Sequence, residues 1–316
     1  MNANKFALAL VAATLSANVL FAAPRIRVIC DNDFGGDPDG LFQLAQQVLS
    51  PTCEVRGIIC SNNHRGGYYK PFSAENAELQ ARELLKLLGI DGIKIVRSIE
   101  GEIESLETPG ENAGADLIVE EAMRDDTRPL YVLCGGGLSA IATAWLKEPR
   151  IAERLTLVWI GGREYPEDVR TECQARAEYN WRIDPKATQV VFNKSNLRLW
   201  QIPRVTYCQT MVSQAELETQ LTGPAGKWLV NKLYGTIRPE SSETYKLGDS
   251  PLVLVTALQA PWQNEIQSCE YIYRKAPIIT DEGAYEPNPE GRTIRVITKV
   301  DTRLMFGDMF AKLKNR

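Results

Sequence analysis

The chain has 316 residues, of which 44% are hydrophobic and 24% charged, which is enough to bury one large core or two small ones. Its net charge of −4 and the lack of a Lys/Arg run argue against nucleic acid as a partner. Seven cysteines in so long a chain do not indicate a disulfide scaffold, and no Cys-x-x-Cys or Cys/His spacing indicates zinc. The single histidine, His64, excludes any mechanism that needs two.

Residues 1–23 differ in composition from the rest of the chain. Lys5 supplies a positive start, the residues from Phe6 to Phe21 are mostly apolar or small, and two alanines precede Pro24. This pattern predicts a secretory signal peptide that is cleaved near Ala23, with a buried N-terminal helix as the alternative. We therefore expect an exported protein, periplasmic or extracellular. We expect no membrane attachment after cleavage, because no other apolar run approaches the roughly 20 residues that span a bilayer.

The mature chain begins with a short apolar run, 26–29, which predicts a buried strand. Apolar residues at helical spacing from Leu41 to Leu49 predict the first helix. The pattern then predicts strands at 54–60, 93–96, 129–134 and 155–160, helices at 75–88, 114–124 and 138–147, a helix opened by Asp184 and Pro185, polar helices within 213–245, and strands with a closing helix in 270–316. This alternation predicts an α/β fold that is Rossmann-like, with a mostly parallel central sheet flanked by helices. No internal repeat or linker is visible, so we expect a single domain from 24 to 316.

Several polar or glycine-rich segments directly follow the predicted strands. They are the acidic loop after the first strand, Asn62-Asn63, the triple glycine 135–137 and Gly161-Gly162. Ligands of parallel α/β sheets bind beyond the carboxyl ends of the strands. The sequence therefore predicts one ligand site where these segments meet.

The acidic loop places four aspartates, Asp31, Asp33, Asp37 and Asp39, within nine residues. So dense a cluster beside a buried strand favours neutralisation by a hard, oxygen-seeking cation such as Ca²⁺ or Mg²⁺ over a purely solvated loop. An EF-hand is excluded, because Phe42 stands where that loop needs a bidentate Glu. A strand followed by Asp-x-Asp also resembles the haloacid-dehalogenase phosphatases, but Gly35 stands where their motif has Thr or Val.

The residues from Asp31 to Gly40 resemble the Asp-Thr-Asp-x-Gly-x-Asp-x-Asp-Asp signature of the inosine–uridine-preferring nucleoside hydrolases. The likeness continues in chain order through five further segments, of which the first, from Asn76-Ala77 to Leu88-Gly89, resembles the second helix of the family. The segment Gly136-Gly137-Leu138-Ser139-Ala140-Ile141-Ala142 is similar to their Gly-Pro-Leu-Thr-Asn segment, and Ile160-Gly161-Gly162 to their Met-Gly-Gly. Ala177-Glu178-Tyr179-Asn180 followed by Asp184-Pro185 resembles their Glu-Phe-Asn and Asp-Pro, and Gly248-Asp249 their His-Asp pair.

The resemblance implies hydrolysis of the N-glycosidic bond of a ribonucleoside by a water that Ca²⁺ and an aspartate activate. It implies Asp33 as catalytic base. The implied metal ligands are Asp33, the Ser139 backbone carbonyl and Asp249. Asp37 is taken as a further ligand, because Gly40 stands where the family has a metal-binding aspartate. The implied substrate contacts are Asp39, Glu178, Asn180 and an asparagine of the 62–63 loop, taken as Asn63. A homodimer or homotetramer is also implied.

Two positions depart from the family pattern. Gly40 replaces the last aspartate of the signature, a calcium ligand, and Gly248 replaces the histidine that helps the departing base. Two alternatives therefore stay open: a hydrolase of another glycoside, or a sugar- or nucleoside-binding protein that keeps the pocket without turnover.

Overall fold

The computed structural model describes residues 23–64, 73–166, 177–236, 241–261 and 267–316. Apart from Ala23, the predicted signal peptide lies outside the described residues.

The central sheet has eight strands in the order β3-β2-β1-β4-β5-β6-β12-β9, and only the β12–β9 pair is antiparallel. Its strands are β1 (Ile26–Asn32), β2 (Cys53–Cys60), β3 (Ile95–Arg97), β4 (Leu130–Cys134), β5 (Leu155–Ile160), β6 (Arg198–Ile202), β9 (Cys269–Lys275) and β12 (Thr293–Val300). The expected mostly parallel α/β fold is confirmed.

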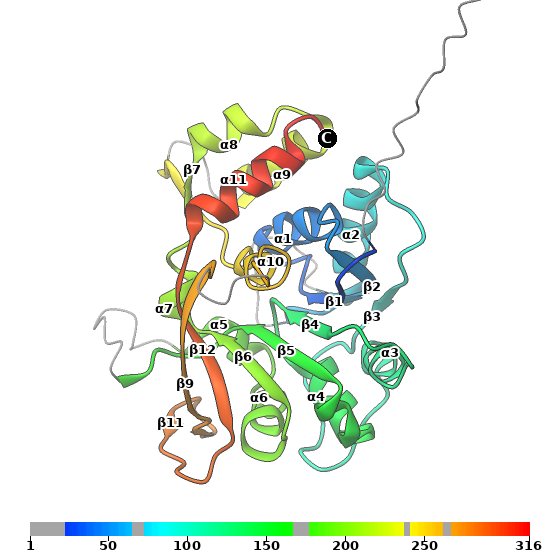
Figure 1. Cartoon of the computed structure of the whole chain (residues 1–316), viewed down its shortest axis with the longest axis vertical. Coiled ribbons are helices and arrows are strands. Elements are labelled where there is room, and N and C mark those ends of the chain that lie inside the picture. The colour runs from blue at the N-terminus through cyan, green and yellow to red at the C-terminus, as the bar shows by residue number, and fades with distance from the viewer. Residues whose placement is uncertain (1–22, 65–72, 167–176, 237–240, 262–266) are drawn as a thin grey trace, which may run out of the picture.

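Helices cover both faces of this sheet (Figure 1). One face carries α1 (Asp39–Val48), α2 (Ala74–Leu88) and α10 (Pro251–Leu254), with α9 (Pro224–Thr236) and α11 (Thr302–Leu313) packed beyond them. The other carries α3 (Ala113–Ala122), α4 (Ser139–Lys147) and α6 (Pro185–Gln189). Two apolar cores result, one on each face, because the inner strands have buried residues on both sides.

Shorter elements complete the described part of the chain. They are the helices α5 (Tyr179–Ile183), α7 (Arg204–Tyr207) and α8 (Gln214–Gln220), the 3-10 helix η1 (Pro149–Glu153), the π-helical turn η3 (Val190–Lys194), the pair β7 (Met211–Ser213) with β8 (Thr244–Lys246), and the pair β10 (Ile278–Ile279) with β11 (Tyr285–Glu286). Neither β6 nor the β7–β8 pair was predicted from the sequence. The β7–β8 pair brackets the expected polar helices of 213–245. One sheet joins residues 26 to 300, while the single domain from 24 to 316 stays a prediction.

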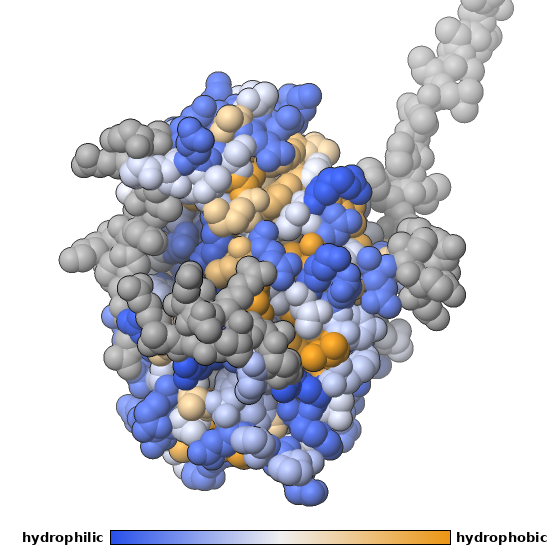
Figure 2. Space-filling view, turned by 90° about the vertical axis from the view of Figure 1, so that its left-hand side faces the viewer, coloured by the Kyte–Doolittle hydropathy of each residue, from blue (hydrophilic) through white to orange (hydrophobic). Residues whose placement is uncertain are grey.

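The face of the molecule in Figure 2 is largely hydrophilic, with apolar side chains in several separate areas. Within the described ranges, no helix is long and apolar enough to cross a bilayer.

Candidate active site

The acidic loop follows the central strand β1, which is buried along its whole length between β2 and β4. Asp31 pairs in register with Ile59 of β2 and Cys134 of β4, and all three strands run in the same direction. The segments that follow these strands therefore leave the sheet at one edge. This arrangement confirms the predicted meeting of the acidic loop with the 62–63 and 135–137 loops.

Asp31 fastens the ends of the three strands to one another. Ser61 Oγ donates to its Oδ1 at 2.6 Å and Cys134 Sγ donates to its Oδ2 at 3.7 Å. The side chain is 1% exposed, and this burial raises the pKa of Asp31 to about 7. Because both carboxylate oxygens accept hydrogen bonds from the neighbouring strand ends, Asp31 stabilises the sheet edge that carries the site.

Asn32 connects β1 to a segment more than 200 residues away. Its Oδ1 accepts the backbone N–H of Asp33 at 2.9 Å, and its Nδ2 donates to Asp249 Oδ2 at 2.9 Å. A Cβ at Gly135 would meet the Asn32 amide at 2.1 Å, and a Cβ at Gly40 would meet it at 2.8 Å. The space beside Gly40 is thus filled by the Asn32 side chain, so a metal-binding side chain at position 40 would have no room.

This packing was missed in the sequence analysis, which considered Gly40 alone. The signal was present, because Asn32 stands where the family signature has the smaller Thr. In this chain the larger residue at 32 fills the space beside the smaller one at 40.

Asp33 lies at the centre of the site and is 7% exposed. Asn63 Nδ2 donates to its Oδ2, and Tyr179 Oη donates to Asn63 Oδ1 at 3.1 Å. Asn62 instead donates to the carbonyls of Ile99 and Gly101, so Asn63 is the asparagine of this loop that faces the acidic cluster. Burial, followed by the charge of Asp39, raises the pKa of Asp33 well above its ordinary value.

Three further aspartates gather around Asp33. Burial and then the charge of Asp249 raise the pKa of Asp39 to about 8, and burial and then Asp39 raise that of Asp37 to about 7. Burial also raises the pKa of Asp249 well above its usual range, although the hydrogen bond from Asn32 opposes this shift. The structure therefore brings Asp33, Asp37, Asp39 and Asp249 together, as predicted.

The sequence analysis also missed a lysine beside this cluster. Lys246, the last residue of β8, places its Nζ 5.0 Å from the centre of the Tyr207 ring. Burial alone would lower the pKa of Lys246, but the charges of Asp39 and Asp37 raise it above its ordinary value. Among the described residues, no lysine or arginine forms a contact ion pair with the four clustered aspartates.

The remaining predicted residues make bonds within the protein. Ser139 is the first residue of α4, and its hydroxyl donates to Asp184 Oδ2 at 2.6 Å. Asn180 Nδ2 donates to the carbonyls of Gly135 and Ile160, both at 2.8 Å. It thereby holds the ends of β4 and β5 together.

Glu178 is fully buried at the start of α5. Its Oε2 accepts the backbone N–H groups of Gly162 and Trp181, and its Oε1 accepts the Tyr207 hydroxyl at 2.7 Å. These contacts fix Glu178 as a helix cap. The ribose contacts of Glu178 and Asn180, and the Ser139 carbonyl as a ligand, stay predictions.

Within the described part of the chain, no three His, Cys, Asp or Glu side chains form a ready-made metal centre. The donor set nevertheless fits a hard cation. Buried carboxylates that raise one another's pKa and lack a contact cation favour binding of an ion that prefers oxygen ligands.

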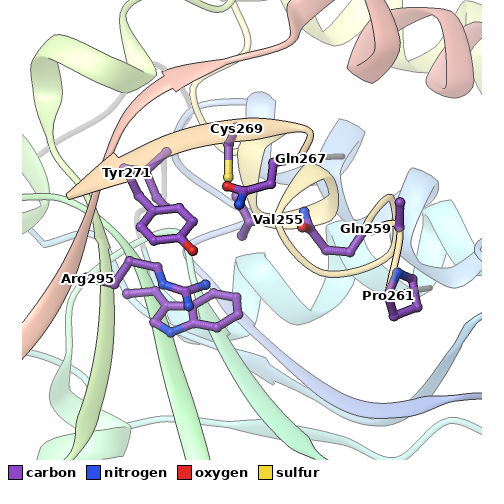
Figure 3. Close-up of a pocket in the computed structure, with 10 residues that line it drawn as sticks. Val255, Gln259, Pro261, Gln267, Cys269, Tyr271 and Arg295 are labelled. Carbon is purple, nitrogen blue, oxygen red and sulfur yellow. The ribbon is translucent and has the colours of Figure 1, made fainter. Parts of the chain in front are cut away.

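A separate surface cavity of about 330 Å³ lies against β6, β9 and β12 (Figure 3). There the Arg295 guanidinium lies 4.1 Å from the centres of the Trp200 and Tyr271 rings. None of the described residues that line this cavity belongs to the predicted site. It is therefore distinct from the aspartate cluster.

The fold and the buried carboxylates together define a Rossmann-like α/β protein with a cluster of aspartates at the carboxyl edge of its sheet. A family model described as "Inosine-uridine preferring nucleoside hydrolase" matches residues 28–306, and the chain belongs to that family. The match includes all the predicted site residues. The resemblance that was stated from the sequence is confirmed.

Two curated relatives carry the same description. One from Crithidia fasciculata is 36% identical over 95 residues, which make up 30% of this chain and 28% of the relative. One from Leishmania major is 34% identical over 89 residues, which make up 28% of this chain and 26% of the relative. The chain thus aligns with less than a third of the length of either relative.

Solved structures extend the likeness over nearly the whole chain. A purine-preferring ribonucleoside hydrolase from Gardnerella vaginalis matches with a TM-score of 0.71 and 19% identity, over 91% of this chain and 98% of its own. An inosine-uridine preferring nucleoside hydrolase from Bacillus anthracis matches with a TM-score of 0.69 and 16% identity, over 92% and 99%. At this identity the likeness shows a shared fold.

Proposed function

We propose that this chain hydrolyses the N-glycosidic bond of ribonucleosides to ribose and free base. The observation that carries the proposal is the placement of Asp33 beside Asp39 and Asp249 at the carboxyl end of the central strand. Membership of the nucleoside hydrolase family supports the same reaction class. Asp33 would act as the base that takes a proton from water, and the hydrogen bond from Asn63 to its Oδ2 would hold it in place.

Ca²⁺ is the cation we propose for this site. Asp33, Asp37, Asp249 and the Ser139 carbonyl would hold it, and when bound it would orient the ribose hydroxyls and the attacking water. Asp39, Asn63, Glu178 and Asn180 would bind the ribose hydroxyls. Negative side chains around the sugar stabilise the cationic, oxocarbenium-like state through which glycosidic bonds break.

A second candidate is a protein that binds nucleosides or sugars without turnover. Asn32 fills the space beside Gly40, and Gly248 offers no side chain to a departing base. Product analysis separates the two candidates, because only the first releases free base. A hydrolase of another glycoside would release free sugar from a different leaving group.

The leader-like composition of residues 1–23 supports export to the periplasm or outside the cell. A homodimer or homotetramer is a further proposal, and size-exclusion chromatography with light scattering tests it.

The test is calorimetric titration of Ca²⁺ into EDTA-stripped protein, followed by assay of base release from inosine and uridine. We expect calcium binding and base release in the wild type and neither in Asp33→Ala or Asp249→Ala, with all variants folded. Asp116→Asn, at an exposed carboxylate paired with Lys147, is the matched control and keeps both properties. Calcium binding that survives in both site variants would refute the site assignment.

A further inference from the structure

The side chain of Lys246 is fixed at the edge of the aspartate cluster. Strand β8 pairs with β7, with Lys246 opposite Met211, and the next residue anchors the chain through a hydrogen bond from Leu247 N–H to the Thr210 carbonyl. The ammonium lies against the face of Tyr207, whose hydroxyl is fixed by Glu178. Both the backbone and the ring contact therefore hold Lys246 in place.

Gly248 shows which way Lys246 extends. A Cβ at Gly248 would have Asp39 Oδ2 at 3.2 Å, Lys246 Cε at 3.4 Å and Tyr207 Cδ2 at 3.4 Å as its nearest neighbours. The lysine chain and the tyrosine ring thus lie where a side chain at 248 would project. The end of the lysine chain and an oxygen of Asp39 flank the same point, so the ammonium borders the site.

The charges around Lys246 favour an ammonium at this place. Asp37, Asp39 and Asp249 attract it electrostatically, yet no described carboxylate lies at contact distance from it. The ammonium carries three N–H donors. A ligand group beside Asp39 could accept a hydrogen bond from one of these donors.

We propose that Lys246 is a catalytic residue that donates a hydrogen bond to the departing base, from the side that Gly248 leaves open. This inference rests on the proposed nucleoside hydrolysis. The C1′–N bond breaks and its electron pair goes to the base, while the water oxygen bonds to C1′ and the water proton goes to Asp33. The ammonium stabilises the negative charge that develops on the base, which takes its proton from solvent on release.

Dependence on the leaving group tests this role. Lys246→Met removes the charge but keeps the length of the chain, and Lys246→Arg keeps a charged donor. Lys232→Met is the matched control, because Lys232 lies 4.7 Å from the centre of the Trp228 ring in an equivalent contact on α9. The substrates are inosine, whose base is a poor leaving group, and 4-nitrophenyl β-ribofuranoside, whose phenolate leaves without help.

We expect Lys246→Met to lower kcat on inosine about 100-fold, in the range of acid–base assistance, while the nitrophenyl riboside loses only a few-fold. Lys246→Arg should recover part of the inosine activity, and Lys232→Met should match the wild type. Calcium binding of Lys246→Met, measured by calorimetry, should be as tight as in the wild type or tighter, because an ammonium beside the cation is removed. Tight calcium binding also shows that the variant is folded.

Equal losses on the two substrates, or no loss on inosine, would overturn the role of Lys246 while leaving the proposed function intact. A wild type that cleaves only the nitrophenyl riboside would also overturn it. A wild type that cleaves neither substrate would refute the proposed function, and the role of Lys246 with it.

Discussion

The packing of Asn32 against Gly40 predicts a strong energetic coupling between these two positions. A Cβ at position 40 would lie 2.8–2.9 Å from three side-chain atoms of Asn32, closer than such atoms approach without displacement. Overpacking of this kind costs about 1–3 kcal/mol. Gly40 is the second residue of α1, so a helix-propensity gain of at most about 1 kcal/mol opposes this cost. Gly40→Ala should therefore lower the free energy of unfolding by about 1–2 kcal/mol.

Asn32→Ala removes every atom that Gly40→Ala would strike. On its own it should lower the free energy of unfolding by about 2–4 kcal/mol, because it deletes one hydrogen bond to a buried carboxylate and one to a backbone N–H. In the Asn32→Ala variant, Gly40→Ala should instead raise the free energy of unfolding, by up to about 1 kcal/mol. The coupling energy between the two positions is then about 2 kcal/mol.

Urea unfolding of the EDTA-treated wild type, both single variants and the double variant measures this coupling. Gly307→Ala is the control, because Gly307 lies on α11 with no atom within 4 Å of its added Cβ. It should stabilise the protein equally with Asn32 or Ala at position 32. Effects of Gly40→Ala and Asn32→Ala that add within about 0.5 kcal/mol would refute the packing argument.

Three further outcomes are expected. The free energy of unfolding of the metal-free protein should fall between pH 5 and pH 8. The folded pKa values of Asp31 and Asp39, about 7 and about 8, lie above those of the unfolded chain, so the folded state is favoured at low pH, where both groups are protonated. Urea unfolding in EDTA that shows stability rising with pH would contradict this. Calcium at 100 times its Kd should raise the free energy of unfolding by about 2.7 kcal/mol, and a Tm unchanged by calcium would count against the metal site. Glu178→Gln should lower the free energy of unfolding by about 1–3 kcal/mol, because the glutamine amide cannot accept hydrogen bonds at both former oxygen positions. Urea unfolding measures the loss, with Glu216→Gln as the surface control.

The fold and the acidic cluster could be predicted because both follow from local patterns in the sequence. β1 concentrates apolar residues in a short segment, and α1 presents apolar residues at helical spacing, so the two patterns indicate a strand and a helix. The strand β6 escaped prediction because Arg198 and Gln201 interrupt its apolar residues. Gln201 is nevertheless fully buried, since Tyr165, Gly161 and Tyr285 satisfy its amide.

Asn32 and Lys246 could not be assigned from local pattern, because their contacts join distant segments. Asn32 meets Asp249 across 217 positions of sequence, and Lys246 reaches the site only because β8 pairs with β7. The two residues lie next to the two positions that depart from the family signature. Asn32 occupies the space beside Gly40, and Lys246 lies where a side chain at Gly248 would project. Each of the two glycines therefore borders a larger or charged side chain that comes from another position of the chain.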